Sequence, residues 1–152
     1  MFNQLPMQIH SRILQPGDEN LLSQLIDNYI LVFEHEKEVK PSPGYISSLL
    51  NKTDMFFMAA ILNNQTLAGG LTFHLLSSVY SEKPEVYIYD FGINPNYQRK
   101  GIGTKLLNDL KEYCIEKNYG TIFVQAETVD EHALNFYRKN GGEENDVRHF
   151  SF

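Results

Sequence analysis

The sequence has few of the features that would place a protein in a specialised class. Its 152 residues include one cysteine, Cys114, and no tryptophan. A single cysteine excludes an intrachain disulfide framework, which favours a reducing compartment and predicts a cytoplasmic protein. No apolar run approaches the roughly 18 residues of a membrane-spanning helix, and the first residues do not combine a basic segment with an apolar core.

Positive charge is also scarce. The chain has 13 Lys and Arg against 19 Asp and Glu, a formal net charge of −6. Nucleic acids and anionic membranes both require a basic surface, so neither is an expected partner. The histidines show no metal-ligand spacing, and the sequence therefore predicts no metal site. An acidic protein is better suited to a cationic partner.

Hydrophobic periodicity and turn residues divide the chain into strands and helices. Its length and its 42% hydrophobic content predict a single globular domain over residues 1–152. The expected elements are strands over 8–14, 55–62, 66–76, 86–93, 121–126 and 147–152, and helices over 18–33, from 41–44 onward, over 101–117 and over 130–140. The strand–helix–strand order predicts that 86–93 and 121–126 run parallel. The fold class is thus α/β (mixed α+β), with a mostly antiparallel sheet and one parallel pair.

Two glycines stand where an apolar strand gives way to a helix, in the segment Gln98-Arg99-Lys100-Gly101-Ile102-Gly103-Thr104. Glycine lets backbone N–H groups approach a ligand closely, and the first N–H groups of a helix lack partners within it. With basic side chains beside it, such a helix start can bind phosphate. The alternative is a turn that uses glycine for tight packing, with solvated basic residues.

A second pattern lies in the helix expected over 130–140, where the segment reads Asp130-x-x-Ala133-x-x-Phe136-Tyr137-x-Lys139-x-Gly141. It resembles motif B of the GNAT acyl-CoA N-acyltransferases, in which a tyrosine stands next to the coenzyme sulfur. The Q-x-x-G-x-G of residues 98–103 resembles their pyrophosphate-binding motif A. The resemblance implies a GNAT fold flanked by about four helices and acetyl-CoA as co-substrate. It also implies a set of coenzyme-binding residues: Phe91, Ile93, Arg99, Lys100, Gly101, Ile102, Gly103, Thr104 and Asp130.

Shorter segments narrow the resemblance to one group. Residues 87–90, 124–126, 130–131 and 149–150 are similar to the aminoglycoside 3-N-acetyltransferases of type I. The likeness implies transfer of acetyl to the 3-amino group of an aminoglycoside. The alternatives are a polyamine, another amine metabolite, a peptide amine, or a coenzyme-binding module without catalysis. A monomer and a homodimer both stay open.

Direct transfer of an acetyl group from a thioester to an amine in a ternary complex makes three chemical demands on the site. The amine must arrive deprotonated, the carbonyl oxygen needs hydrogen-bond donors, and the leaving thiolate needs a proton. Tyr137 is the candidate acid, and its alternative is a tyrosine on the apolar face of its helix. A backbone N–H of residues 91–93 is the candidate carbonyl donor, freed where the strand splays or where Gly92 allows a bulge.

Acidic residues are the candidates for binding the amine. Asp90 interrupts an apolar strand, where a carboxylate is costly unless it is paired. We expect it to orient and attract the amine, and a structural ion pair is the alternative. Glu127 and Asp130 extend the candidate acidic cleft after the next strand. Thr128-x-x-Glu131 predicts a capping box for the helix that follows, and Cys114 is expected in the core.

Overall fold

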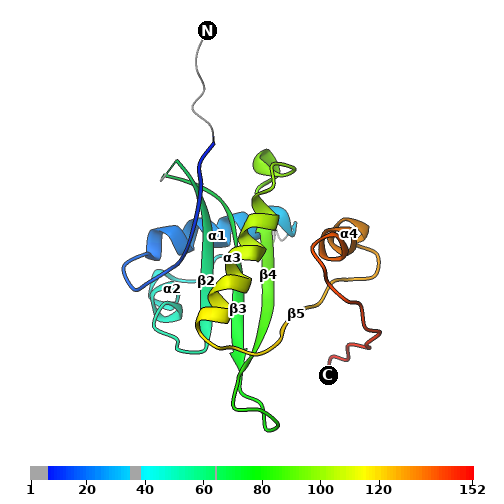
Figure 1. The fold of residues 1–152 in the computed structure, drawn as a ribbon. Helices are drawn as coiled ribbons and strands as arrows, with labels where there is room; N and C mark the ends of the chain where they lie inside the picture. Colours follow the sequence, from blue (N-terminus) through cyan, green and yellow to red (C-terminus); the bar gives the residue numbers. More distant parts are fainter. Residues whose placement is uncertain (1–6, 35–38, 64) are drawn as a thin grey trace.

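The computed structural model describes residues 7–34, 39–63 and 65–152 (Figure 1). In chain order its elements are β1 (Ile9–Ile13), α1 (Glu19–Val32), α2 (Pro43–Leu49), β2 (Met55–Leu62), β3 (Thr66–Leu76), β4 (Glu85–Ile93), the 3-10 turn η1 (Pro95–Tyr97), α3 (Ile102–Glu116), β5 (Ile122–Val124) and α4 (Glu131–Lys139). No helix in these described ranges has the length and apolar character that a membrane crossing requires.

The strands form one open sheet in the order β1-β2-β3-β4-β5. All neighbours pair antiparallel except β4 and β5, which are parallel. Helix α3 covers one face of the sheet, and α1 and α2 cover the other (Figure 1). The mixed sheet with one parallel pair is therefore confirmed.

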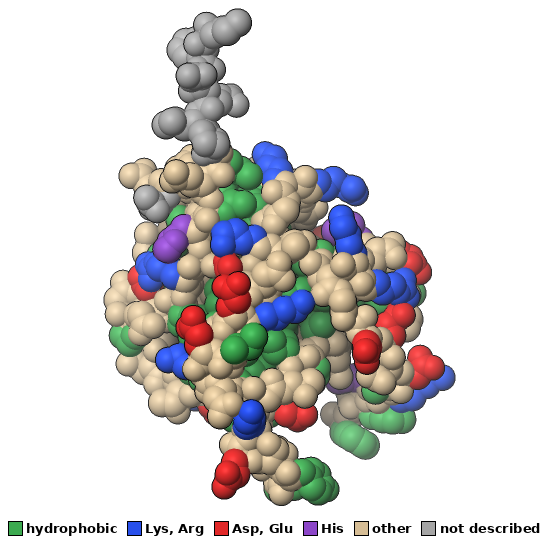
Figure 2. Space-filling model, in the orientation of Figure 1, with side chains coloured by type: hydrophobic (Ala, Val, Ile, Leu, Met, Phe, Trp, Pro, Cys, Tyr) green, Lys and Arg blue, Asp and Glu red, His purple; other side chains and the backbone are tan. Residues whose placement is uncertain are grey.

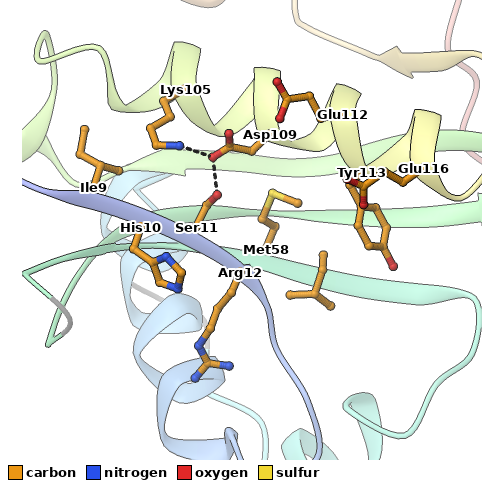
Figure 3. Close-up of a pocket in the computed structure, with 11 residues that line it drawn as sticks. Ile9, His10, Ser11, Arg12, Met58, Lys105, Asp109, Glu112, Tyr113 and Glu116 are labelled. Carbon is orange, nitrogen blue, oxygen red and sulfur yellow. Dashed lines mark hydrogen bonds and ion pairs between the residues drawn. The ribbon is translucent and has the colours of Figure 1, made fainter.

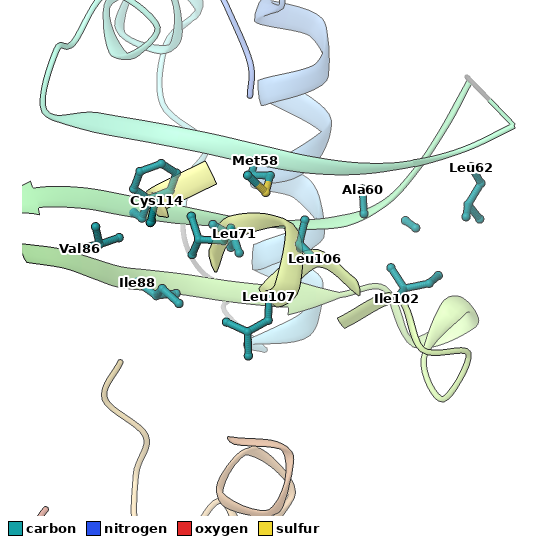
Figure 4. Close-up of a cluster of buried hydrophobic side chains, with 13 residues drawn as sticks. Met58, Ala60, Leu62, Leu71, Val86, Ile88, Ile102, Leu106, Leu107 and Cys114 are labelled. Carbon is teal, nitrogen blue, oxygen red and sulfur yellow. The ribbon is translucent and has the colours of Figure 1, made fainter. Parts of the chain in front are cut away.

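Two hydrophobic cores hold the helices on the sheet. Leu106 and Leu110 of α3 pack against one face, where Met58 points (Figure 4), and Leu22 and Leu25 of α1 pack against the other. Successive side chains of β2 alternate between these cores, because neighbouring residues of a strand point to opposite faces. Buried on both sides, the middle of the sheet forms a rigid floor.

Cys114 lies in the core under α3, as expected. Burial raises the pKa of its thiol to about 11, so the thiol stays protonated at neutral pH. Because the thiolate is the reactive form, Cys114 is a packing residue. On the face seen in Figure 2, basic and acidic side chains are interspersed.

The expected strand over 147–152 is wrong, since these residues form no regular secondary structure. The side chains of Val147, Phe150 and Phe152 are exposed. Apolar alternation gives this segment strand propensity, but a strand also needs a neighbour with which to exchange hydrogen bonds. Strand β5 is also shorter than the expected 121–126.

Two irregularities in β4 shape the site. Thr72 lies opposite Asp90 whereas the next residue of β3 lies opposite Ile88, so Tyr89 is the extra residue of a bulge. The pairing of β4 with β5 ends at Ile88 opposite Val124, although β4 continues to Ile93. The expected splay is present, but the bulge lies at Tyr89 and not at Gly92, which stays paired opposite Gly70.

Candidate active site

The turn between β4 and α3 is built around left-handed backbone. Arg99 has a φ of 59° and Gly101, the N-cap of α3, has a φ of 77°. Helix α3 then begins at Ile102, which is buried in the core, and has no acidic residue in its first turn. The N–H groups of that turn, together with the cations of Arg99 and Lys100, therefore make a positively polarised helix start that fits a pyrophosphate.

Hydrogen bonds fix the direction of the β4 backbone at the splay. The N–H of Asn94 donates to the carbonyl of Ala68 in β3 (2.8 Å), and the side-chain amide of Gln98 donates to the carbonyl of Ile93 (2.9 Å). Backbone groups of successive residues in a strand point to alternate sides. The N–H groups of Ile93 and Phe91 consequently point away from β3, to the side where β5 has ended.

The two motif segments meet at Gly103. A Cβ placed there would lie 3.2 Å from Cε2 of Phe136 in α4 and 3.7 Å from Cγ1 of Ile93. The Phe136 ring in turn lies 5.4 Å from the Phe91 ring, measured between centroids. Gly103 therefore has the packing role that the sequence left as an alternative, since it lets α4 approach α3. Gly101 has open space around its Cα, so its glycine is required by the backbone angle.

Tyr137 stands beside the splay on α4. Its ring makes an edge contact with Phe91, with centroids 6.4 Å apart. Partial burial, with a smaller contribution from the charge of Asp130, raises the pKa of Tyr137 to about 12. The phenol is therefore protonated, and able to donate a hydrogen bond, throughout the neutral and mildly alkaline range.

Asp130 begins α4 as its N-cap. Its Oδ1 accepts a hydrogen bond from the N–H of Ala133 (3.0 Å). The capping box expected from Thr128 and Glu131 is therefore wrong, because an aspartate one residue before the helix accepts the first free N–H groups directly. The side chains of Asp130 and Glu127 are exposed, and their binding roles stay predictions.

Asp90 lies on the sheet face that carries α1. It is opposite Thr72, whose hydroxyl lies 3.1 Å from the hydroxyl of Tyr29 in α1. Burial raises the pKa of both Tyr29 and Tyr87, and the negative charge of Asp90 adds to the rise for each. The carboxylate of Asp90 is thus close to Tyr29 of α1 and to Tyr87 of β4. Its role toward an amine stays a prediction.

Sequence reasoning missed Asn28, a buried polar residue of α1. Its side-chain amide donates to the carbonyl of Gly92 (3.0 Å), and its Oδ1 is buried without a hydrogen-bond partner among the described residues. This bond ties α1 to the splayed half of β4. The available signal was the spacing of Leu22, Leu25 and Asn28, which places an amide on the apolar stripe of the helix.

A separate groove of about 330 Å³ lies between β1 and α3 (Figure 3). Asp109 projects into it and binds the ammonium of Lys105 (2.8 Å) and the hydroxyl of Ser11. The groove contains no residue of the glycine turn, the splay or α4. The residues that carry the two motifs thus gather at the other end of the sheet, and the described part of the chain has no cluster of metal-binding side chains.

Comparison with known proteins decides the family. Residues 21–142 match the acetyltransferase (GNAT) family. The chain belongs to this family. Acetyltransferases of the family use acetyl-CoA, and the GNAT fold and the N-acetyltransferase class expected from the sequence are confirmed.

Solved structures similar to this chain include aminoglycoside acetyltransferases. An aminoglycoside acetyltransferase from an uncultured soil metagenomic sample, crystallised with sisomicin, is 36% identical with a TM-score of 0.91, over 95% of both chains. A second such enzyme from soil metagenomic DNA is 30% identical with a TM-score of 0.86, over 96% of this chain and 98% of that one. The zebrafish (Danio rerio) N-alpha-acetyltransferase 50 is 38% identical over 60 residues, which cover 38% of this chain and only 35% of that protein.

The glycine turn makes a first prediction. If the N–H groups of this turn bind the coenzyme, Gly101→Val should shift them, because left-handed backbone costs a non-glycine residue about 1–2 kcal/mol. We expect acetyl-CoA to bind at least about tenfold more weakly, measured by titration calorimetry. The matched control is Gly17→Val, at a glycine with a φ of 106° and equally open space far from the motifs. An unchanged affinity in folded Gly101→Val would contradict the assignment.

Proposed function

We propose that this GNAT acetyltransferase transfers the acetyl group of acetyl-CoA directly to a primary amine of a small polycationic substrate, the 3-amino group of an aminoglycoside being the first candidate. The observation that carries the proposal is the splay of β4 from β5, bordered by the glycine turn, Tyr137 and Asp90. The likeness to aminoglycoside acetyltransferases over nearly the whole chain supports the substrate class.

The backbone of the splay suits a thioester substrate. When bound, acetyl-CoA supplies an electrophilic carbonyl carbon with a thiolate leaving group. The turn before α3, with Arg99 and Lys100, would hold the pyrophosphate. The N–H groups of Phe91 and Ile93, directed to the side where β5 has ended, would bind the remaining chain and stabilise negative charge on the carbonyl oxygen. Ile102 and Thr104, in the first turn of α3, and Asp130, at the start of α4, are the remaining proposed coenzyme-binding residues.

Tyr137 is the proposed acid for the leaving sulfur. As the carbon–nitrogen bond forms and the carbon–sulfur bond breaks, the phenol donates its proton to sulfur, and the proton lost by the amine leaves through water. A pKa of about 12 keeps the Tyr137 phenol protonated and neutral until the proton is transferred. Burial raises the pKa of a thiol, as it does for Cys114, so a coenzyme sulfur shielded from water would accept the proton more readily.

Acidic side chains are the proposed attraction for the amine. Asp90 would orient the cationic acceptor at the inner end of the site, and the exposed carboxylates of Glu127 and Asp130 would attract it at the entrance. A lone carboxylate is a weak base for an alkylammonium, so Asp90 acts by position and charge, with water carrying the proton. The cytoplasmic location stays a prediction from cysteine usage.

A homodimer is also proposed. The exposed apolar side chains of Val147, Phe150 and Phe152 support it, since all three belong to the C-terminal segment and none has a buried position in the chain. Sedimentation velocity at micromolar concentration tests this point, and a monomer across the concentration range would remove it.

Tyr137 gives the second prediction. Tyr137→Phe should lower kcat by about 10²- to 10⁴-fold with little change in acetyl-CoA affinity, because a proton donated at sulfur acts mainly in the transition state. An acid is competent below its pKa, so with a pKa of about 12 the wild-type kcat should show no decline from Tyr137 ionisation up to pH 10. Tyr113→Phe, a partly buried tyrosine of α3 outside the site, is the matched control. A Tyr137→Phe rate within about twofold of wild type would assign the proton to another group.

The acceptor gives the third prediction. A panel of aminoglycosides, linear polyamines and peptide amines, assayed for acetyl-CoA-dependent thiol release with mass spectrometry of the products, should show transfer to an aminoglycoside. On the best amine, Asp90→Asn should lower kcat/KM about tenfold or more, since it loses a charge-assisted contact. The matched control is Asp54→Asn, an exposed aspartate at the start of β2.

Other results would redirect the assignment. Transfer to linear polyamines alone would replace the aminoglycoside by the alternative acceptor. Acetyl-CoA binding without transfer to any amine would support the non-catalytic module. Equal activity of wild type and Asp90→Asn toward every accepted amine would remove Asp90 from the acceptor site.

A further inference from the structure

Four aromatic side chains form a row across β3, β4 and β5, on the sheet face opposite α3. The ring centroids of His74 and Tyr89 are 5.7 Å apart, those of Tyr89 and Tyr87 are 5.7 Å apart, and Tyr87 stacks on Phe123 at 4.8 Å. The hydroxyl of Tyr87 donates to Oε1 of Gln125 (2.9 Å), which fixes its orientation. We refer to these four side chains as the aromatic row.

The aromatic row lies outside both hydrophobic cores, with His74, Tyr87 and Phe123 half-buried and Tyr89 exposed. Tyr29 and Val32 of α1 pack over Gly92 of β4, beyond the bulge. Tyr89, which lies inside the row between His74 and Tyr87, is its most exposed ring, at 65%.

The bulge joins Asp90 to this surface. In a regular strand Asp90 would share a face with Val86 and Ile88, which are buried under α3. The extra residue Tyr89 shifts the alternation, so Asp90 lies opposite Thr72 on the face that carries Tyr87 and Tyr89. The rise in the pKa of Tyr87, to which the charge of Asp90 contributes after burial, agrees with this proximity. An aromatic surface and a carboxylate are thus combined at one place.

We propose that the aromatic row, with Tyr89 as its central exposed ring, binds the ring face of a cyclic amine and so selects cyclic polycations over linear ones. This inference rests on the proposed function and adds the residue that determines acceptor specificity. Apolar C–H faces of sugar and aminocyclitol rings pack against aromatic rings, whereas the ammonium groups of cyclic and linear amines alike are attracted to Asp90. A linear polyamine has the charges but no ring face to present.

Substitution at Tyr89 separates ring contact from charge. Tyr89→Ala should lower kcat/KM for the best aminoglycoside about five- to thirtyfold, while changing kcat/KM for a linear polyamine less than about twofold. Tyr89→Phe should stay near wild type for both, because it keeps the ring. Tyr80→Ala, at a tyrosine 96% exposed in the β3–β4 connection, is the matched control. Equal losses for the cyclic and linear amines, or no loss for either, would overturn the inference.

A binding measurement keeps this inference testable if the protein acetylates nothing. Sisomicin is titrated calorimetrically into wild type, Tyr89→Ala and Tyr80→Ala, with no acetyl-CoA present. Weaker binding in Tyr89→Ala alone supports the aromatic row even where the proposed function fails. Equal affinity in all three proteins, or no binding to wild type, overturns it whether or not acetyl transfer occurs.

Discussion

Strand β4 is paired along its length with β3 but only over its first residues with β5, and the site depends on this difference. From Ile88 onward β4 continues while β5 has ended at Val124. Backbone N–H and C=O groups that lose a strand neighbour need other partners. The Gln98 side chain supplies one for the carbonyl of Ile93. An extended substrate that enters between the two strands would supply others.

Packing holds the splay open. Gly103 lets α4 approach α3 through Phe136, and the Phe136 ring contacts Phe91 of β4. Tyr137, the next residue of α4, also contacts the Phe91 ring, through an edge. On the opposite face Asn28 holds the carbonyl of Gly92. The middle of the sheet is buried on both faces and therefore rigid, so these contacts hold β4 and α4 in fixed positions.

Local signals in the sequence were sufficient for much of this arrangement. Periodicity located α3 and the hairpin of β2 and β3, and the residues of the glycine turn indicated where a helix would begin. The order of strand, helix and strand was sufficient for the parallel pair. Each of these features depends on residues close together in the chain or on handedness rules.

Features that depend on contacts between residues distant in the chain could not be predicted from the sequence in the same way. The bulge at Tyr89 is a matter of register between β3 and β4, and a one-residue shift leaves the composition of both strands unchanged. Asp130 caps α4 because the helix begins one residue after it. The capping-box pattern instead placed the N-cap at Thr128, two residues too early. Residues 147–152 have the pattern of a strand, but pattern alone does not supply a pairing partner.

If the splay of β4 and the turn before α3 form one binding site for acetyl-CoA, the ligand should affect both at once. The most direct measurement is a titration of isotope-labelled protein with acetyl-CoA, followed by the backbone amide signals in NMR spectra. The amides of Phe91, Ile93, Gly101 and the first turn of α3 should shift together with a single dissociation constant. Shifts confined to the groove between β1 and α3, with these amides unchanged, would contradict it.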